Sequence, residues 1–232
     1  MCIHGFNKTT LLDYPRHLAA TIFIGGCNMR CPFCHNSSLV LHPEDVPVIS
    51  AEDILSYLSK RRNILEGVCI TGGEPTLYAD ELIKLVKSIK NLGLKVKLDT
   101  NGSNPILLKD LIKNRLIDYV AMDIKNSKEN YGLSIGIKNY NTNKVNESIE
   151  YLLNSPIEYE FRTTIVKEHH KSQDILSIGQ WIKGANSYYL QSYKDSGDII
   201  SPGLHSHSKD TLESFVQLLA PFVSKVELRG VD

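Results

Sequence analysis

The sequence predicts an α/β fold, a partial and open (β/α) barrel with mostly parallel strands. Short apolar runs typical of strands alternate with amphipathic segments of helical period along nearly the whole chain, which favours parallel βαβ units with right-handed crossovers. The chain accommodates about seven such strands, slightly too few for a closed eight-fold barrel with full loops. We expect one domain over residues 1–232, with an N-terminal extension at 1–16 and the barrel at 17–232.

The individual elements follow from this alternation. Ser50 is the predicted N-cap of the first helix, and Gly93 ends the second. The expected strands are residues 18–24, 68–71, 94–98, 117–122, 157–166, 188–191 and 225–228. The expected helices are residues 51–62, 80–91, 105–114, 142–153, 172–183 and 209–222. The apolar residues of 4–15 should cover one end of the sheet, and the polar segment 126–141 should form a loop over the pocket mouth.

Charge and hydropathy exclude several classes of function. The 26 basic residues balance the 26 acidic ones, so nothing indicates a nucleic-acid partner or a polybasic membrane contact. The first residues do not form a signal peptide, and no apolar run approaches the roughly 18 residues of a membrane span. With these features, the cysteine usage predicts a reducing, cytoplasmic location.

A short cysteine-rich loop is the strongest functional signal. Cys27, Cys31 and Cys34 are spaced C-x3-C-x2-C in a segment that contains Pro32 and follows an apolar strand and two glycines. Three thiolates on a four-iron cluster leave one iron open to bind a substrate or cofactor. A zinc site completed by His35 is the alternative, and a disulfide framework is disfavoured in a long chain without a secretory signal.

Acidic residues follow three successive predicted strands. Glu74 ends a Gly72-Gly73-Glu74 turn, and Asp99 and Asp123 end the next two strands. The carboxyl ends of parallel strands meet at one face, so we expect these acids to surround a common pocket. The other predicted members of this face are the cysteine loop, Thr100, Asn101, Lys125, Arg162 and Gln191. Arg162 lies in mid-strand and should point either at an anion or at solvent.

The remaining cysteines and histidines have simpler interpretations. Cys69 lies in an apolar strand and is expected to be a small core residue, and Cys2 lies near the terminus. His205 and His207 could bind a metal, although a solvated loop is favoured by their Gly/Ser/Pro-rich surroundings. Trp181 is expected to be a packing residue.

With these residues in place, the sequence resembles the radical S-adenosylmethionine (SAM) enzymes over almost the whole chain, and among them the glycyl-radical-enzyme activating proteins. Residues 10–15 (TLLDYP), Ile22, Phe23 and residues 26–36 are similar to activating proteins of the anaerobic ribonucleoside-triphosphate reductase. The resemblance implies that the three loop cysteines ligate a [4Fe-4S] cluster whose open iron takes the amino and carboxylate groups of SAM. Glu74, with its two glycines, would accept a hydrogen bond from that amino group.

The resemblance also implies contacts with the rest of SAM. Phe33 and His35 match positions whose backbone contacts adenine, and Lys125 and Arg162 match basic residues near the carboxylate and ribose. Further SAM-binding positions match Asp99, Thr100, Asn101 and Gln191, and the pair Asp99 and Asp123 matches acids that hold a possible monovalent cation.

The implied reaction is reductive. The reduced cluster gives one electron to SAM, and the resulting 5′-deoxyadenosyl radical abstracts hydrogen from a glycine of a partner protein. The implied partners are the large subunit of the anaerobic ribonucleotide reductase and a flavodoxin or ferredoxin as electron donor. The alternatives are activation of another glycyl radical enzyme of the pyruvate formate-lyase type, or a non-catalytic metal-binding protein.

Overall fold

The computed structural model describes residues 1–231. Contacts between residues divide this chain into two compact units. The first unit contains residues 1–28 and 38–121, and the second contains residues 29–37 and the chain from 122 onward. The expected single domain stays a prediction, and each unit is described by itself.

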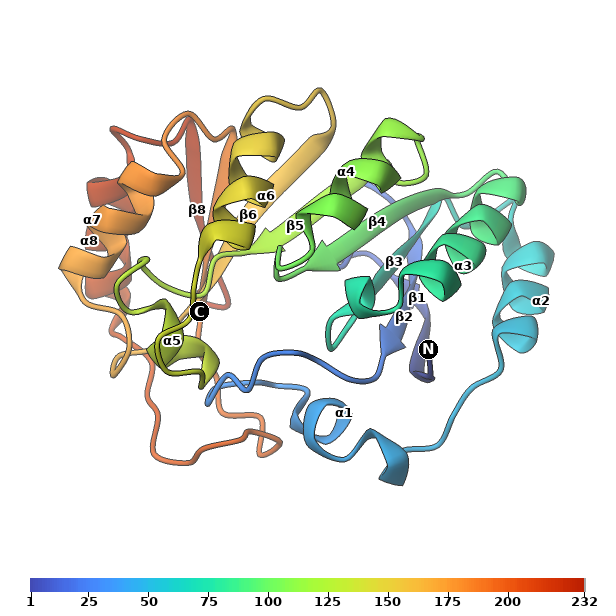
Figure 1. Cartoon of the computed structure of the whole chain (residues 1–232), viewed down its shortest axis with the longest axis horizontal. Helices are drawn as coiled ribbons and strands as arrows, with labels where there is room; N and C mark the ends of the chain where they lie inside the picture. The colour runs from blue at the N-terminus through green and yellow to red at the C-terminus, as the bar shows by residue number, and fades with distance from the viewer. Residues whose placement is uncertain (232) are drawn as a thin grey trace. The chain divides into compact units, whose positions relative to one another are not determined.

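The first unit is built on four adjacent strands (Figure 1). Strand β2 pairs in parallel with β3, and β3 with β4, whereas β1 pairs with β2 in the antiparallel direction. The strands are β1 (Ile3–Thr10), β2 (Ala19–Ile24), β3 (Gly67–Gly72) and β4 (Lys95–Thr100). Its helices are α2 (Ala51–Arg61), α3 (Ala79–Asn91) and α4 (Pro105–Lys113), with 3-10 turns η1 (Pro43–Asp45) and η2 (Pro75–Leu77), and α1 (Ser37–Leu41) begins at the unit boundary.

Alternation along the strands separates two faces of this sheet. Val68 and Ile70 of β3 are fully buried, as are Val86 and Ile89 of α3, so one face carries an apolar core. The intervening strand positions form the opposite face, which bears polar side chains. Ser50 caps α2, as predicted, by accepting a hydrogen bond from the backbone N–H of Asp53 at 3.1 Å.

The N-terminal extension differs from the prediction because it contains a strand. In β1 only the two end residues are buried, so pairing with β2 rather than an apolar pattern defines the strand. Tyr14 does cover part of the sheet, being 2% exposed and packed beside Tyr119 with ring centroids 5.9 Å apart. Leu11 and Leu12 do not, since they are 75% and 90% exposed.

The second unit is built on three adjacent parallel strands, β6 to β8, with α7 and α8 packed against each other (Figure 1). Strand β5 (Tyr119–Asp123) crosses the unit boundary. The strands of this unit are β6 (Glu158–Ile165), β7 (Ser187–Ser192) and β8 (Lys225–Arg229). The helices are α5 (Tyr131–Ile135), α6 (Asn143–Leu153), α7 (Ser172–Trp181) and α8 (Lys209–Leu219).

Residues 126–141 form a partly buried segment with one short helix, rather than the polar loop that was expected. The Asn126 side chain is fully buried and donates 2.9 Å hydrogen bonds to Ser134 Oγ and to the carbonyl of His169. Tyr131 is also fully buried and packs edge-to-face against Trp181, which confirms the packing role predicted for Trp181. Hydrogen bonds within the protein, rather than the solvent that the polar composition indicated, satisfy the buried polar side chains of this segment.

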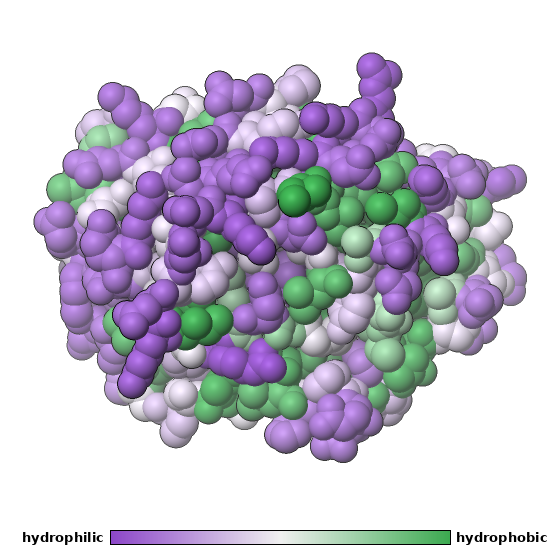
Figure 2. All heavy atoms as spheres, viewed as in Figure 1, coloured by the Kyte–Doolittle hydropathy of each residue, from purple (hydrophilic) through white to green (hydrophobic). Residues whose placement is uncertain are grey.

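Hydrophilic residues cover much of the face drawn in Figure 2, and the green hydrophobic residues on it fall into separate groups. Among the described residues, no helix has the length and apolar character needed to cross a membrane.

Candidate active site

In the first unit, the turn after β3 is held against the backbone that precedes Cys27. The N–H of Gly73 donates to the carbonyl of Ile24 at 2.7 Å, and the N–H of Glu74 donates to the carbonyl of Gly26 at 2.8 Å. A Cβ on Gly73 would lie 1.9 Å from the Gly26 oxygen. The glycines therefore allow two backbones to meet directly, and this contact fixes the start of the cysteine loop.

Glu74 is enclosed by the ends of β3 and β4. Its side chain is fully buried, and Oε1 accepts hydrogen bonds from the backbone N–H and hydroxyl of Thr76 and from the hydroxyl of Thr100. Its Oε2 accepts from the N–H of Asn101 at 2.6 Å. Burial raises the pKa of Glu74, and these hydrogen bonds oppose that rise. Glu74 therefore holds Thr100 and Asn101 in place, and its predicted hydrogen bond from the amino group of SAM stays a prediction.

Asn28 connects the cysteine loop to the loop that follows β4. Its Oδ1 accepts from Asn101 Nδ2 and its Nδ2 donates to Ser103 Oγ, each at 2.9 Å. The sequence reasoning did not single out Asn28 or Ser103, although Asn28 lies within the 26–36 segment. The predicted residues Thr100 and Asn101 thus join one network with Glu74 and with the residue that follows Cys27.

The second predicted acid-bearing strand end, at Asp99, has a lysine beside it. Lys97 and Asp99 lie on the same face of β4, and the Lys97 ammonium donates to Asp99 Oδ1. Cys69 of β3 is fully buried, as predicted for a core residue, and its Sγ lies 3.6 Å from the same oxygen of Asp99.

In the second unit, Cys31 and Cys34 lie in one turn. The N–H of Cys34 donates to the carbonyl of Cys31 at 3.0 Å, and Ser201 N–H donates to the carbonyl of Pro32 at 2.9 Å. Cys31 is 8% exposed. Burial raises the pKa of the Cys34 thiol, while the nearby charge of Lys125 opposes that rise.

Aromatic side chains pack around this turn. Phe33 is 4% exposed and lies edge-on to His169, with ring centroids 5.6 Å apart. His35 stacks on Tyr193 at 5.7 Å and its Nε2 donates to the carbonyl of Lys194 at 2.7 Å. This hydrogen bond engages one of the two ring nitrogens of His35, an arrangement that metal-bound histidines also have, so it does not exclude the zinc alternative.

Asp123, Lys125 and Arg162 form a charged group in the second unit. Lys125 Nζ donates to one oxygen of Asp123 at 2.9 Å, and Arg162 Nε donates to the other at 3.0 Å. Burial alone would raise the pKa of Asp123, but the two cations lower it to about 2. Of the two orientations left open for Arg162, the structure shows the one toward an anion. One carboxylate between two cations leaves an excess positive charge, which suits a carboxylate ligand.

Two further residues of the second unit lie on the same sheet face as this group or contact its backbone. Gln191 lies opposite Thr164 in the β6–β7 pairing, so it shares a sheet face with Arg162. His170, which the sequence reasoning missed, donates from Nε2 to the carbonyl of Lys125 at 2.9 Å. Burial lowers the pKa of His170 to about 4, so a neutral imidazole fixes the backbone of Lys125.

Comparisons with known proteins identify the family of this chain. The profile of the radical SAM superfamily matches residues 21–179. A putative glycyl-radical enzyme activating enzyme of Methanocaldococcus jannaschii is 30% identical over 236 residues, which cover 99% of this chain and 96% of that protein. This chain belongs to the radical SAM superfamily.

Other relatives define the group and the fold. The pyruvate formate-lyase 1-activating enzyme of Escherichia coli K12 is 27% identical over 71% of this chain and 67% of that protein. Streptococcus suis SuiB has a TM-score of 0.70 at 15% identity, covering 91% of this chain and 49% of the SuiB chain. The predicted α/β fold of the radical SAM type, with a mostly parallel open sheet, is confirmed, as is the prediction of a glycyl-radical-enzyme activating enzyme.

Membership of the radical SAM superfamily implies a [4Fe-4S] cluster and SAM, and the donor groups fit both. Cys31 and Cys34 lie beside the positive charge of Lys125, which favours the thiolates that iron requires. In the second unit, the two cations around Asp123 suit the carboxylate group of SAM. The implied monovalent cation fits less well, because Asp99 is bound by Lys97 and Asp123 by two cations.

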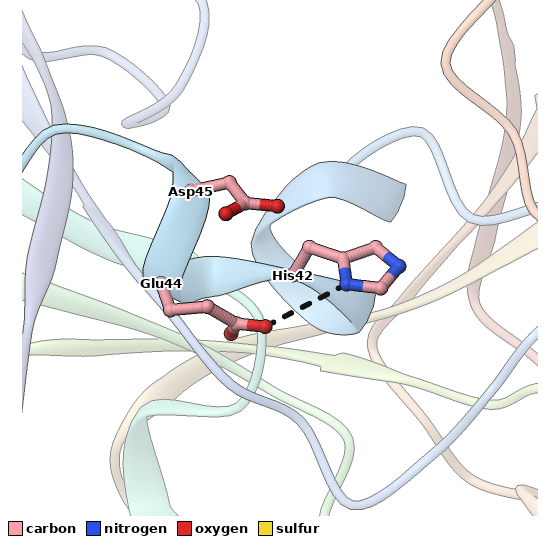
Figure 3. Close-up of side chains that lie close together, drawn as sticks. All are labelled: His42, Glu44 and Asp45. Carbon is pink, nitrogen blue, oxygen red and sulfur yellow. Dashed lines mark ion pairs between the residues drawn. The ribbon is translucent and has the colours of Figure 1, made fainter.

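The two histidines that the sequence left as possible metal ligands have hydrogen-bond partners within the protein. His205 Nδ1 lies 2.9 Å from Glu168 Oε1, and His207 Nε2 donates to the carbonyl of His170 at 2.8 Å. Within the described chain, neither belongs to a group of three potential metal ligands. His42, Glu44 and Asp45 do form such a group at η1 (Figure 3), but all three are exposed and nothing assigns a ligand to them.

Proposed function

We propose that this protein reductively cleaves SAM at a [4Fe-4S] cluster and generates a glycyl radical on the anaerobic ribonucleoside-triphosphate reductase. The observation that carries the choice of target is the pair of segments 10–15 and 26–36, which resemble the activating proteins of that reductase. A flavodoxin or ferredoxin would supply the electron, and the setting would be the cytoplasm, where cysteines stay reduced.

Cys27, Cys31 and Cys34 would hold the cluster. When bound, the cluster supplies the electron that breaks the bond between the SAM sulfur and C5′, and the radical chemistry then belongs to SAM. The protein's part is to hold the cysteine loop rigid. It does so through the Gly73 and Glu74 backbone contacts in the first unit and through Ser201 and the packing of Phe33 in the second.

Residues at the strand ends would bind and orient SAM. The excess positive charge of Lys125 and Arg162 around Asp123 attracts the methionine carboxylate. Asn101 is fixed through its backbone N–H by Glu74 and through its side chain by Asn28 and the N–H of Ser103, so the loop after β4 has one orientation. His170 and Phe33 are buried beside the cysteine turn and exclude water from it.

A pyruvate formate-lyase type of enzyme is the second candidate partner. It is favoured by the similarity to the E. coli formate-lyase activating enzyme over 71% of this chain. The two candidates share all the SAM chemistry and differ only in the glycine that loses hydrogen.

The test is electron paramagnetic resonance of mixtures. The reduced, reconstituted protein with SAM is mixed with the anaerobic ribonucleotide reductase of the same organism, and in parallel with its formate-lyase-type enzyme. A glycyl radical doublet with the reductase, with 5′-deoxyadenosine formed in proportion, is expected. A doublet only with the formate-lyase-type enzyme would replace the first partner by the second.

The segment 126–141 offers a surface for the partner. Nine residues between 128 and 140 line a hollow of about 530 Å³, within the range of specific binding sites, and Leu133, one of the nine, is 56% exposed. Leu133→Asp should reduce glycyl radical yield while SAM cleavage without partner is unchanged. Leu218→Asp is the matched control, because Leu218 is an exposed leucine of α8 in the same unit. Equal radical yields in both variants would remove this surface from the proposal.

A further inference from the structure

A lysine lies inside the fold where the reaction gives it no role. Lys97 is 1% exposed and occupies the middle of β4, opposite Cys69 in the β3–β4 pairing. A lysine at a fully buried strand position is costly unless a counter-charge accompanies it. Asp99, two residues further on the same strand face, supplies that charge.

One oxygen of Asp99 has two side-chain partners, Lys97 on its own strand and Cys69 on the neighbouring strand β3. Asp99 Oδ1 accepts from the Lys97 ammonium, and Cys69 Sγ lies 3.6 Å from the same atom. Lys97 Nζ is also 3.7 Å from that sulfur, so the three side chains form one compact group. The Asp99 side chain is only 12% exposed, which limits competition from water.

This group conflicts with the monovalent cation implied by the resemblance. Hard cations take oxygen ligands, carboxylates among them, and Asp99 would be such a ligand. A metal cation on Asp99 would face the Lys97 ammonium across one buried carboxylate, and like charges repel strongly where water is excluded. Asp123 gives no free charge either, because Lys125 and Arg162 bind both of its oxygens.

We propose that Lys97 is a built-in replacement for the monovalent cation, and that it positions the Asp99 carboxylate without any added Na⁺ or K⁺. The proposal rests on the proposed function only for the statement that Asp99 lies in the SAM site. Its statement about cation binding holds for the protein without cluster or SAM.

The first test measures thermal unfolding of the protein without cluster or SAM, in KCl and in choline chloride at equal ionic strength. The wild-type midpoint should be the same in both salts. Lys97→Met removes the ammonium group and leaves an unbranched side chain one heavy atom shorter, so a cation can enter beside Asp99. Its midpoint should rise in KCl by about 2–4 °C at a K⁺ concentration about five times the dissociation constant.

Lys90→Met is the matched control. Lys90 pairs with Asp118 at 2.7 Å in the same unit, but the two side chains are 29% and 32% exposed, so water already solvates the carboxylate. Its midpoint should show no difference between the salts. A wild-type midpoint that rises specifically with K⁺ would overturn the proposal, and this result does not depend on whether Lys97→Met folds.

The second test measures SAM binding by the anaerobic, iron-reconstituted protein in the same two salts. Wild-type affinity should agree within about twofold, whereas Lys97→Met should bind SAM about tenfold more tightly in KCl than in choline chloride. Equal affinities for Lys97→Met in both salts would overturn the proposal. A wild-type protein that binds no SAM in either salt would contradict the proposed function, while the unfolding midpoints would still decide the role of Lys97.

Discussion

Glu74→Gln is the substitution that best separates a positioning role from a ligand contact. The change keeps the shape of the side chain but removes its charge and one acceptor. In the variant, the amide oxygen can retain the hydrogen bonds from Thr76 and Thr100. The amide NH2 then faces the N–H of Asn101, which in the wild type donates to Glu74 at 2.6 Å and in the variant loses its acceptor. A lost hydrogen bond to a charged group costs about 1.5–3 kcal/mol, and more where a donor is left buried without an acceptor.

That cost should appear in the protein before any ligand is added. For a chain of this size, about 1.5–3 kcal/mol lowers the unfolding midpoint by roughly 3–12 °C. Thermal unfolding of the protein without cluster or SAM measures it. Glu66→Gln is the control, because Glu66 is an exposed glutamate of the same unit that accepts one backbone hydrogen bond, at 2.9 Å from Leu18. Its midpoint should change by less than about 2 °C.

SAM titration of the reconstituted variant completes the argument. If Glu74 positions Asn101, SAM affinity falls together with the stability of the ligand-free protein. An unchanged midpoint with a ten- to hundred-fold loss of SAM affinity, about 1.5–3 kcal/mol, would refute this reasoning and restore a direct contact.

Three further predictions concern the same loops. Alanine at any of the three loop cysteines should abolish the iron–sulfur signal in iron analysis and paramagnetic resonance, whereas Cys69→Ala should keep it; a full cluster in any loop variant would exclude that ligand. Gly73→Ala would place a methyl group 1.9 Å from a backbone oxygen and should prevent cluster reconstitution. The control Gly184→Ala, with no atom within 4 Å and φ of +92°, should lower the free energy of unfolding by only about 1–2 kcal/mol. Successful reconstitution of Gly73→Ala would contradict the packing argument. Asp123→Asn should lose about 2 kcal/mol of unfolding free energy at neutral pH, because the Asp123 pKa falls from 3.8 to about 2 on folding. A depressed pKa stabilises the fold above pH 3.8, so the difference between wild type and Asp123→Asn should shrink as the pH falls toward 2 in denaturant titrations, and a constant difference would contradict the ion-pair assignment.

The order of strands and helices could be predicted from the sequence because apolar periodicity reports burial directly. Strands β2 to β8 and the six longer helices lie within a few residues of their expected ranges. Strand β1 was missed because its side chains are mostly exposed or half-buried and its pairing with β2 depends on backbone groups, which leave no pattern in the sequence. Helix α5 was missed because Asn126 and its neighbours are polar yet buried by hydrogen bonds among side chains.

The sequence could place acidic residues at strand ends, but it could not show which partner each acid has. Asp123 is bound by Lys125 and Arg162, two residues that the sequence also predicted for the site. Asp99 is bound by Lys97, which looked like an ordinary strand residue because alternation assigns a face and not a counter-ion. Asn28 and His170 act through backbone and amide contacts that depend on the meeting of distant loops.

The Gly72-Gly73-Glu74 turn shows why a motif can identify a site without identifying the contact. A carboxylate at a strand end resembles a ligand group, but an ionised carboxylate without exposure is stable only when donors surround it. Here those donors come from Thr76 in its own turn and from the loop after β4, so the charge of Glu74 ties two strand ends together. Because Glu74 is fully buried, its hydrogen bonds to these two loops form whether or not a ligand is present. We therefore expect loss of the Glu74 charge to act first on the two groups that it holds, the Thr100 hydroxyl and the backbone N–H of Asn101, and the separate measurement of ligand-free stability tests that order of causes.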